Sequence, residues 1–341
     1  MLAKRGVIII ITVLFCAVCL LTKAWAGQAL PRSSALENLK NFDLGQKISA
    51  FAPEIETHRN VVWARVSHED LFLDVFLPRE DGKYPMVVNI HGGGWSLGSK
   101  EMDEALCKYL AERGYVVFNI NYRLAPEFKF PAQVNDGLGA VIWAKDHAEK
   151  YSGDRERVAV MGDSAGCNLS AMVAFAYDSP NFSPTYTSSH LSNASVQAAV
   201  LIYGVYDMTQ FDSPRNKWIP FFYSYLGGPE DLFPERYMKA SPVEYLKPDK
   251  RYPVVLIIGG DKDSLYTHSV ELKNELEERG IKYSFYTAPG GHHGFISVSS
   301  SKPARETMPV IGDFLDRELK GIRPIKLTQG TFQNRARASG P

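Results

Sequence analysis

The sequence has no excess of either positive or negative charge. Lys and Arg together number 38, Asp and Glu also number 38, and the formal net charge of the 341 residues is zero. A neutral chain has no bulk field to draw it to nucleic acid or to an anionic membrane surface. Internal repeats are also lacking. These absences argue against a nucleic-acid-binding protein or a repeat array, and the length suits one large α/β domain or two ordinary domains.

Cysteine is scarce as well, with four residues in the chain. Cys16 and Cys19 lie in an apolar run near the N-terminus, and beyond that run there is neither a Cys-x-x-Cys pair nor a histidine-rich tract. The pattern therefore indicates no metal or other cofactor. Cys107 and Cys167 both lie in predicted helices, so we expect two separate buried thiols rather than a disulfide.

The first 26 residues are typical of a secretory signal. A short basic head precedes the apolar run Val7–Leu21, and Ala24-Trp25-Ala26 offers small residues at both positions that a signal peptidase reads. The run is shorter than the roughly 20 residues that a membrane-spanning helix needs. We expect cleavage before Gly27 and export to the periplasm or the medium, with an uncleaved N-terminal anchor as the alternative.

Apolar segments of two kinds alternate along the rest of the chain. Short apolar runs indicate strands, and longer amphipathic stretches indicate helices. Strands are expected at 61–66, 71–78, 85–90, 115–122, 158–161, 196–205, 254–258 and 283–287, and helices at 102–113, 132–150, 167–176, 265–279 and 303–319. Strands that alternate with helices predict an α/β fold with a mostly parallel central sheet and helices on both faces.

The remaining segments have weaker patterns. Residues 27–60 are mixed and are expected to form one or two short helices, and residues 178–195 are rich in Ser, Thr, Pro and Asn, which favours a loop. Residues 206–252 hold many aromatics and prolines without a clear period. The tail, residues 321–341, is basic without a single acid, and we expect a flexible end without a function.

The stretch Gly162-Asp163-Ser164-Ala165-Gly166 stands between the apolar run Val158–Met161 and a predicted helix. Strand, sharp turn and helix with Gly-x-Ser-x-Gly at the turn is the nucleophile elbow of an α/β-hydrolase. The turn must hold Ser164 in a strained conformation, and the residues two positions away on either side must then lack side chains. A plain glycine-rich turn is the alternative that the pentapeptide alone leaves open.

A serine hydroxyl is a weak nucleophile and needs a base, which in this fold follows it in the chain together with an acid. His293 is the candidate base, since it lies in a glycine-rich loop after the last predicted strand and precedes Gly294-Phe295. His292 competes with it, but the His-Gly-Phe arrangement favours His293.

Asp263 is the candidate acid, because it follows a predicted strand and precedes a helix. Its carboxylate would accept the second imidazole N–H and fix the tautomer of the base. An aspartate at this place is otherwise a helix N-cap, and Asp261 competes for the role in a way that spacing alone does not separate. Asp163 adjoins the nucleophile but is not assigned, since the elbow turns neighbouring side chains apart.

Donors for an oxyanion are expected from His91-Gly92-Gly93-Gly94-Trp95, directly after the strand at 85–90. Glycines let the backbone approach a bound carbonyl and direct N–H groups at it. The backbone N–H groups of Gly93, Gly94 and Ala165 would form the oxyanion hole. A plain loop or a phosphate nest are the alternatives, and the absence of a following Gly-Lys-Ser/Thr argues against nucleotide binding.

Together these motifs resemble the hormone-sensitive-lipase-like branch of the α/β-hydrolase esterases. The resemblance covers about residues 60–320. The matching stretches, in chain order, are His91–Gly94, Tyr122–Glu127, Gly162–Gly166, Asp263–Leu265 and His293–Phe295. Two positions depart from the family pattern: Cys167 replaces a usual glycine, and Ser264 replaces proline or valine.

The resemblance implies a catalytic domain over residues 27–320 with the triad Ser164, His293 and Asp263, and it favours Asp263 over Asp261. It also implies a helical cap built from about residues 27–60 and 206–252. The aromatics of the second segment would line an acyl or alcohol pocket, or would form the core of the cap itself.

The expected function is that of an exported serine carboxylesterase that hydrolyses small, relatively apolar esters of short acyl chains without a cofactor. Its partner would be a small-molecule ester and not nucleic acid. Two alternatives remain within hydrolases: an esterase for acetyl-xylan or feruloyl groups, and an amidase similar to an aryl formamidase. A third alternative is a catalytically silent ligand-binding protein on the same scaffold, which the presence of His293 argues against.

Overall fold

The computed structural model of the chain describes residues 54–66, 68–190, 193–211, 217–322 and 333–334. The expected signal peptide, residues 1–26, lies outside the described residues, as do residues 27–53 and most of the tail. Within the described residues, none of the helices combines the length and the apolar character that crossing a membrane requires.

The described strands form a single mixed sheet in the spatial order β1-β2-β4-β3-β5-β6-β7-β8-β9. The strands from β3 to β8 run parallel to one another, whereas β1 pairs with β2, β2 with β4, and β8 with β9 in the antiparallel sense. The strand bounds are β1 Ile55–Val66, β2 Glu69–Pro78, β3 Tyr84–Ile90, β4 Val116–Ile120, β5 Gly153–Asp163, β6 Ala198–Ile202, β7 Val254–Gly260, β8 Tyr283–Ala288 and β9 Gln333–Asn334. The predicted mostly parallel sheet is confirmed.

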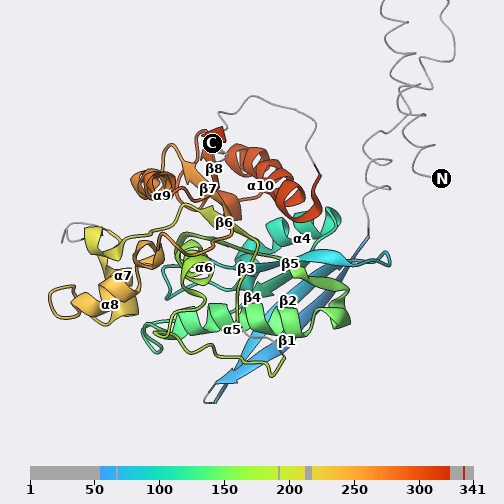
Figure 1. Ribbon diagram of the computed structural model, residues 1–341, viewed down its shortest axis with the longest axis horizontal. Helices are drawn as coiled ribbons and strands as arrows, with labels where there is room; N and C mark the ends of the chain where they lie inside the picture. The colour runs from blue at the N-terminus through green and yellow to red at the C-terminus, as the bar shows by residue number, and fades with distance from the viewer. Residues whose placement is uncertain (1–53, 67, 191–192, 212–216, 323–332, 335–341) are drawn as a thin grey trace, which may run out of the picture. The chain divides into compact units, whose positions relative to one another are not determined.

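Helices cover both faces of the sheet, as predicted (Figure 1). One face packs against α5, α6 and α9, and the other packs against α4 and α10, because alternate residues of each buried strand point to opposite faces. The helix bounds are α4 Glu104–Glu112, α5 Ala132–Asp146, α6 Ser164–Ala176, α7 Ile219–Leu226, α8 Pro234–Lys239, α9 Tyr266–Glu278 and α10 Lys302–Lys320. The short 3₁₀ turns are η1 Lys100–Asp103, η2 Glu149–Tyr151, η3 Met208–Phe211, η4 Pro242–Tyr245 and η5 Phe295–Ser297.

Local sequence explains where α10 begins and ends. The Ser301 side chain accepts a hydrogen bond from the N–H of Ala304 at 3.2 Å, which caps the first turn. Gly321 follows the last residue with φ +68°, a left-handed conformation that glycine adopts at little cost. Both signals are readable in the sequence, and the prediction of a helix at 303–319 is correct to within a residue at each end.

The prediction for residues 27–60 is wrong at its C-terminal end. Ile55–Asn60 belong to β1 and pair with β2 at the edge of the sheet. The strand is hard to recognise because it is partly exposed and its register shifts twice, with Asn60 at φ +53°. An edge strand with bulges loses the strict alternation on which a prediction depends.

Helix α5 is shorter than predicted. It ends at Asp146, and after two turn residues Glu149–Tyr151 form the separate 3₁₀ turn η2, before Ser152 takes a left-handed conformation at φ +58°. The segment after β6 carries η3, α7, α8 and η4, so the described part of residues 206–252 consists of short helical segments joined by turns and loops. Cys107 and Cys167 are buried free thiols, as expected.

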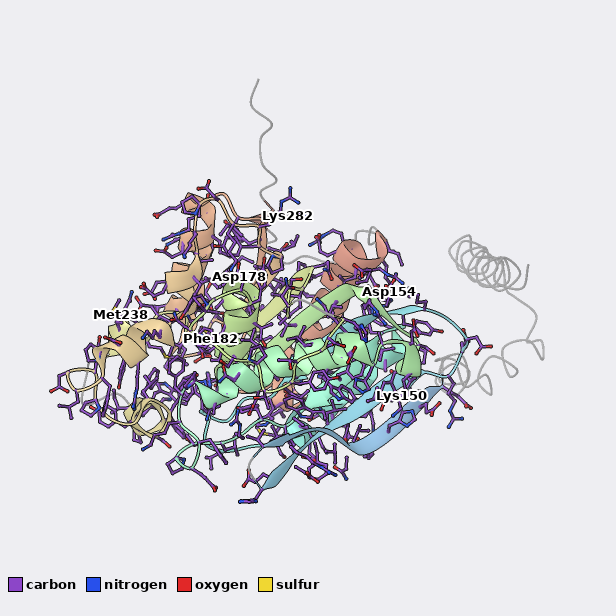
Figure 2. All side chains as sticks on the ribbon, turned by 60° about the horizontal axis from the view of Figure 1, so that its bottom comes forward. Lys150, Asp154, Asp178, Phe182, Met238 and Lys282 are labelled. Atoms are coloured by element: carbon purple, nitrogen blue, oxygen red, sulfur yellow. The ribbon has the colours of Figure 1, made fainter. Side chains whose placement is uncertain are left out.

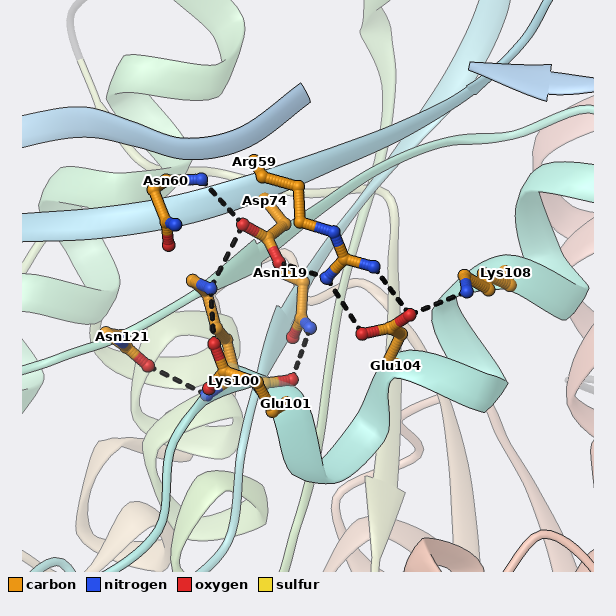
Figure 3. A network of polar contacts seen from close by, with 9 residues as sticks. All are labelled: Arg59, Asn60, Asp74, Lys100, Glu101, Glu104, Lys108, Asn119 and Asn121. Carbon is orange, nitrogen blue, oxygen red and sulfur yellow. Dashed lines mark hydrogen bonds and ion pairs between the residues drawn. The ribbon is translucent and has the colours of Figure 1, made fainter. Parts of the chain in front are cut away.

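A buried ion pair joins η1 to the antiparallel strands (Figure 3). Nζ of Lys100 lies 3.0 Å from Oδ1 of Asp74, and the two side chains are 2% and 1% exposed. Asp74 also accepts hydrogen bonds from the backbone N–H of Asn60 and from Arg59. Removing one partner of such a pair would leave a buried charge, which typically costs about 3–5 kcal/mol. The network therefore holds η1, and with it Asp103, against the sheet.

Candidate active site

The elbow has the geometry that its sequence predicts. Strand β5 ends at Asp163, α6 begins at Ser164, and Ser164 has φ +50°, a strained value for a residue with a side chain. A Cβ on Gly162 would lie 2.4 Å from the carbonyl oxygen of Gly166, and a Cβ on Gly166 would lie 1.9 Å from that of Ile90. Both flanking positions therefore require glycine.

Three side chains that are distant in the sequence meet beside the elbow. Oγ of Ser164 lies 2.8 Å from Nε2 of His293, and Nδ1 of His293 lies 2.9 Å from Oδ2 of Asp263. Ser164 follows β5, Asp263 follows β7, and His293 follows β8, so all three stand at the carboxyl ends of parallel strands. This arrangement lets the imidazole donate its Nδ1–H to the carboxylate while Nε2 accepts the serine proton.

The two competing residues stand elsewhere. Asp261 is exposed, and its carboxylate accepts a hydrogen bond from the backbone N–H of Gly290 at 2.7 Å. Asp263, in contrast, has a side chain with no exposed surface and also accepts the N–H of Leu265 at 2.9 Å. His292 is exposed, whereas the side chain of His293 is 18% exposed. The structure therefore brings Asp263 and His293, and not their neighbours, to Ser164.

The loop after β3 takes backbone conformations that suit glycine. Gly93 has φ +118° and Gly94 has φ +60°, and a Cβ on Gly93 would lie 1.9 Å from the carbonyl oxygen of Leu97. Gly94 and Ala165 border the same small pocket as Ser164, whereas Gly93 is not among its lining residues. The N–H of Ala165 lies in the first turn of α6, where no acceptor exists within the helix.

Residues His91–Gly94 are here called the oxyanion loop. The buried imidazole of His91 stabilises the conformation of this loop. Nδ1 of His91 lies 2.6 Å from the carbonyl oxygen of Gly92, and the ring stacks on Tyr122 with centroids 4.4 Å apart. Tyr122 in turn donates its hydroxyl to the carbonyl oxygen of His91 at 3.1 Å. Burial lowers the pKa of His91 to about 4, so the ring is neutral at pH 7 and its Nδ1–H donates to Gly92.

A narrow apolar pocket opens on Ser164. Its walls are Gly94, Trp95, Ser164, Ala165, Val205, Trp218, Phe221, Phe222 and Leu265. Sequence reasoning singled out the aromatics of residues 206–252 but gave no pocket role to Trp95, Val205 or Leu265, although each is the last residue of a motif or a predicted strand that it did identify. The ring of Trp218 lies 4.6 Å from that of His293, measured between centroids, so the base is shielded on this side.

The aromatics of residues 206–252 divide between pocket and core. Trp218 and Phe221 are partly exposed and line the pocket. Phe222 and Tyr225 are buried and pack on Trp95, with Tyr225 stacked at 4.5 Å. Both alternatives stated for this segment therefore apply, and Phe222 both lines the pocket and packs on the core residue Trp95.

A larger hollow lies at the end of α6, where Figure 2 labels Asp178 and Met238. Lys250 also lines it, but its ammonium group pairs with Asp178 and donates to the carbonyl oxygen of Phe175 at 2.7 Å. No histidine lines this hollow, so it holds no second Ser-His-Asp triad. Within the described residues, no group of three or more His, Cys, Asp or Glu side chains is placed to hold a metal ion.

Comparison with known proteins places this chain in a family. A model of the BD-FAE family matches residues 73–276, more than half of the chain. Esterase LipQ of Mycobacterium tuberculosis is 27% identical over 236 residues, which are 68% of this chain and 55% of LipQ. Ethyl acetate hydrolase of Pseudomonas putida is 27% identical over 245 residues, 67% of this chain and 72% of that protein.

Among solved structures, an esterase of Pyrobaculum calidifontis matches with a TM-score of 0.63 and 27% identity, over 87% of this chain and 97% of that chain. The α/β-hydrolase fold expected from the motifs is thereby confirmed. The chain spans just over half the length of the mycobacterial esterases that it matches, 55% for LipQ and 58% for LipM. The chain is a member of the BD-FAE family and belongs with the hormone-sensitive-lipase-like α/β-hydrolases whose motifs it carries.

Proposed function

We propose that the protein is a serine carboxylesterase that hydrolyses small, relatively apolar esters of short acyl chains. The observation that carries the proposal is the continuous contact from Ser164 through His293 to Asp263, at 2.8 Å and 2.9 Å. Membership of a family whose characterised relatives are named as esterases supports the reaction class.

The mechanism follows from the proton positions in this contact. Oγ of Ser164 attacks the ester carbonyl carbon while Nε2 of His293 takes its proton, and the imidazolium is stabilised by Asp263. The imidazolium then gives that proton to the departing alkoxide, which leaves as an alcohol. Water deprotonated by the same nitrogen attacks the acyl-enzyme, and Ser164 recovers its proton as the carboxylic acid leaves.

The charge that develops on the carbonyl oxygen needs donors that are already in place. In the proposed mechanism the N–H groups of Gly93, Gly94 and Ala165 supply them. A single donor of this kind is typically worth about 2.7–4 kcal/mol in the transition state. The hydrogen bond from His91 to the carbonyl of Gly92 supports the role of this loop, because it limits the reorganisation that the loop would otherwise need.

The preference for short acyl chains is inferred from the pocket. Phe221 lies directly against the oxyanion loop, since a Cβ on Gly94 would fall 2.3 Å from its ring. Trp218 and Leu265 close the same space. An acyl chain longer than a few carbons would have to displace one of these side chains.

Phe221→Ala is therefore expected to raise kcat/KM for a nitrophenyl hexanoate relative to the acetate by about 10-fold, since each added methylene then finds space. The ratio is measured with both esters on the same preparation. Tyr223→Ala is the matched control, because Tyr223 lies on the same helix, is 38% exposed and does not line the pocket. An unchanged ratio in Phe221→Ala would show that the pocket does not select the acyl chain.

A substrate panel tests the proposed function against its alternatives. The full-length protein is assayed with nitrophenyl acetate, butyrate and octanoate, acetyl-xylan, methyl ferulate and an aryl formamide. We expect the highest kcat/KM on the acetate or butyrate ester, and stoichiometric labelling of Ser164 by a serine-directed organophosphate, read by peptide mass. Turnover confined to acetyl-xylan, methyl ferulate or the formamide would overturn the proposed substrate class. Absence of both turnover and labelling would overturn the proposal that the protein is an enzyme.

We also propose that the chain is exported, on the basis of the signal-like residues 1–26. The mass of the protein recovered from an expressing bacterium tests this. A chain that begins at Gly27 outside the cytoplasm supports export, and an intact chain in the cytosol contradicts it.

A further inference from the structure

Two buried carboxyl groups lie beneath the active site without a role in the proposed reaction. Asp103 ends η1 and is 3% exposed, and Asp163 ends β5, just before the nucleophile, and is 4% exposed. Oδ1 of Asp163 is buried and accepts no hydrogen bond from the described residues, and the charge of the nearby Asp103 acts on this carboxyl. A carboxylate can only accept, so the two carboxyls can satisfy each other only when one of them carries a proton. We call Asp103 and Asp163 the carboxyl pair.

The carboxyl pair connects the parts that carry the site. Oδ2 of Asp163 accepts the hydroxyl of Tyr203 at 3.1 Å. A Cβ on Gly92 would lie 2.8 Å from the same oxygen, so the carboxyl packs directly on the oxyanion loop. Asp103 accepts hydrogen bonds from Asn89 at 3.0 Å and from Ser297, the last residue of η5, at 3.5 Å.

Tyr203 extends this connection to the base. Its ring lies 5.0 Å from that of His293 and 5.1 Å from that of Phe295, measured between centroids. Tyr203 has φ +42°, so its backbone is held in a conformation that is unusual for a residue with a side chain. The structure shows no contact of either carboxyl with Ser164 or His293. Both are therefore positioning residues and not catalytic ones.

Among the described residues, the groups that face the carboxyl pair carry no unpaired positive charge to compensate a second negative one. Facing it are Cys107 from α4, Tyr122 after β4 and Tyr203 after β6. Burial raises the pKa of all three, so they stay neutral across the working range. His91 is neutral because burial lowers its pKa, and Lys100 on η1 is paired with Asp74 and Glu101.

Burial raises the pKa of Asp103, and burial together with the charge of Asp103 raises the pKa of Asp163. Both effects favour the protonated form of one carboxyl, because ionising two carboxyls in one buried site costs much more free energy than ionising one. One proton therefore stays on the carboxyl pair well above the pH at which an ordinary aspartate loses it.

We propose that Asp103 and Asp163 share one proton in the active protein, and that this singly protonated carboxyl pair holds the oxyanion loop and Tyr203 in the position that the contact between Ser164 and His293 requires. Loss of the proton at alkaline pH then lowers both activity and stability. The activity part of this inference rests on the proposed esterase function, whereas the stability part does not.

The sign of the pH effect follows from proton linkage. Both carboxyls have a pKa in the folded protein above that in the unfolded chain, so the folded protein binds more protons between the two values. The stabilising contribution is complete below the ordinary aspartate pKa and is lost as the pH rises through the folded-state pKa of the pair. The free energy of unfolding therefore decreases toward alkaline pH.

Asp103→Asn removes the ionisable proton and keeps the shape. The introduced amide can still accept from Asn89 and can donate to Asp163 permanently. In the full-length protein, kcat near pH 7 should stay within about threefold of wild type, while the alkaline limb of kcat moves up by at least about one pH unit. The midpoint of thermal unfolding should fall less steeply than in wild type between about pH 6 and about pH 10.

Asp136→Asn is the matched control. Asp136 is equally buried, but its partner is the guanidinium of Arg123 at 2.6 Å and not a second carboxyl. This variant should lose stability at every pH without a shift of the alkaline limb. Superimposable pH profiles of wild type and Asp103→Asn, in both activity and unfolding, would overturn the proposal.

Difference infrared spectroscopy provides a test that needs neither a folded variant at position 103 nor catalysis. At neutral pH the full-length Ser164→Ala protein should show the carbonyl stretch of a buried protonated carboxylic acid, and this band should disappear on titration to alkaline pH. A spectrum without that band at neutral pH contradicts the shared proton. Failure of the esterase proposal alone would leave the infrared and unfolding results unchanged.

Discussion

Replacing Ser164 by alanine is expected to lower kcat for nitrophenyl butyrate by about 10⁴- to 10⁶-fold, because the acyl-enzyme cannot form without its nucleophile. The residual rate would come from the donors of the oxyanion loop and from substrate positioning. The measurement is the initial rate with the full-length protein, together with the unfolding midpoint to establish that the variant is folded.

Ser170→Ala is the control for this result. Ser170 is a buried serine on the same helix, α6, and does not line the pocket, so its loss should change kcat by less than about threefold. If Ser164→Ala kept wild-type activity, the hydrolysis would have to use another nucleophile. The organophosphate label should likewise be absent from Ser164→Ala and present in the control.

Asp263→Asn is expected to lower kcat by about 10⁴-fold while the protein remains folded. In the wild-type protein the carboxylate of Asp263 accepts Nδ1–H of His293 and so leaves Nε2 free to take the serine proton. An amide that turns its NH₂ group toward Nδ1 stabilises the opposite tautomer, in which Nε2 carries a hydrogen and cannot act as the base. KM should change little, because Asp263 contacts the base and not the substrate.

Asp261→Asn provides the matched comparison, since both aspartates lie in the same turn after β7. The exposed carboxylate of Asp261 accepts only the backbone N–H of Gly290 among the hydrogen bonds described for it, so we expect a change of less than about threefold. A large loss in Asp261→Asn with none in Asp263→Asn would reverse the assignment of the acid. Rates at several substrate concentrations separate kcat from KM in both variants.

Much of the fold was predictable because the signals are local. Apolar runs identified the buried parallel strands, since such strands are covered on both faces and need no alternation. The elbow was predictable for a similar reason: the strain at Ser164 and the two close approaches arise within five consecutive residues or directly beneath them. Strand β1 was missed in part, because bulges and exposure at a sheet edge erase the pattern.

The amino-acid sequence by itself determined which chemical groups are available and the turns that present them: the serine at its elbow, the glycines after β3, and a histidine and an aspartate after later strands. Tertiary structure alone decided which groups meet. Ser164 and His293 are 129 positions apart, and Asp263 differs from Asp261 in the burial and in the partner that the fold gives its carboxylate. Burial of Asp103 beside Asp163 likewise has no local signal, because desolvation depends on every element that packs around a group and not on its neighbours in the chain.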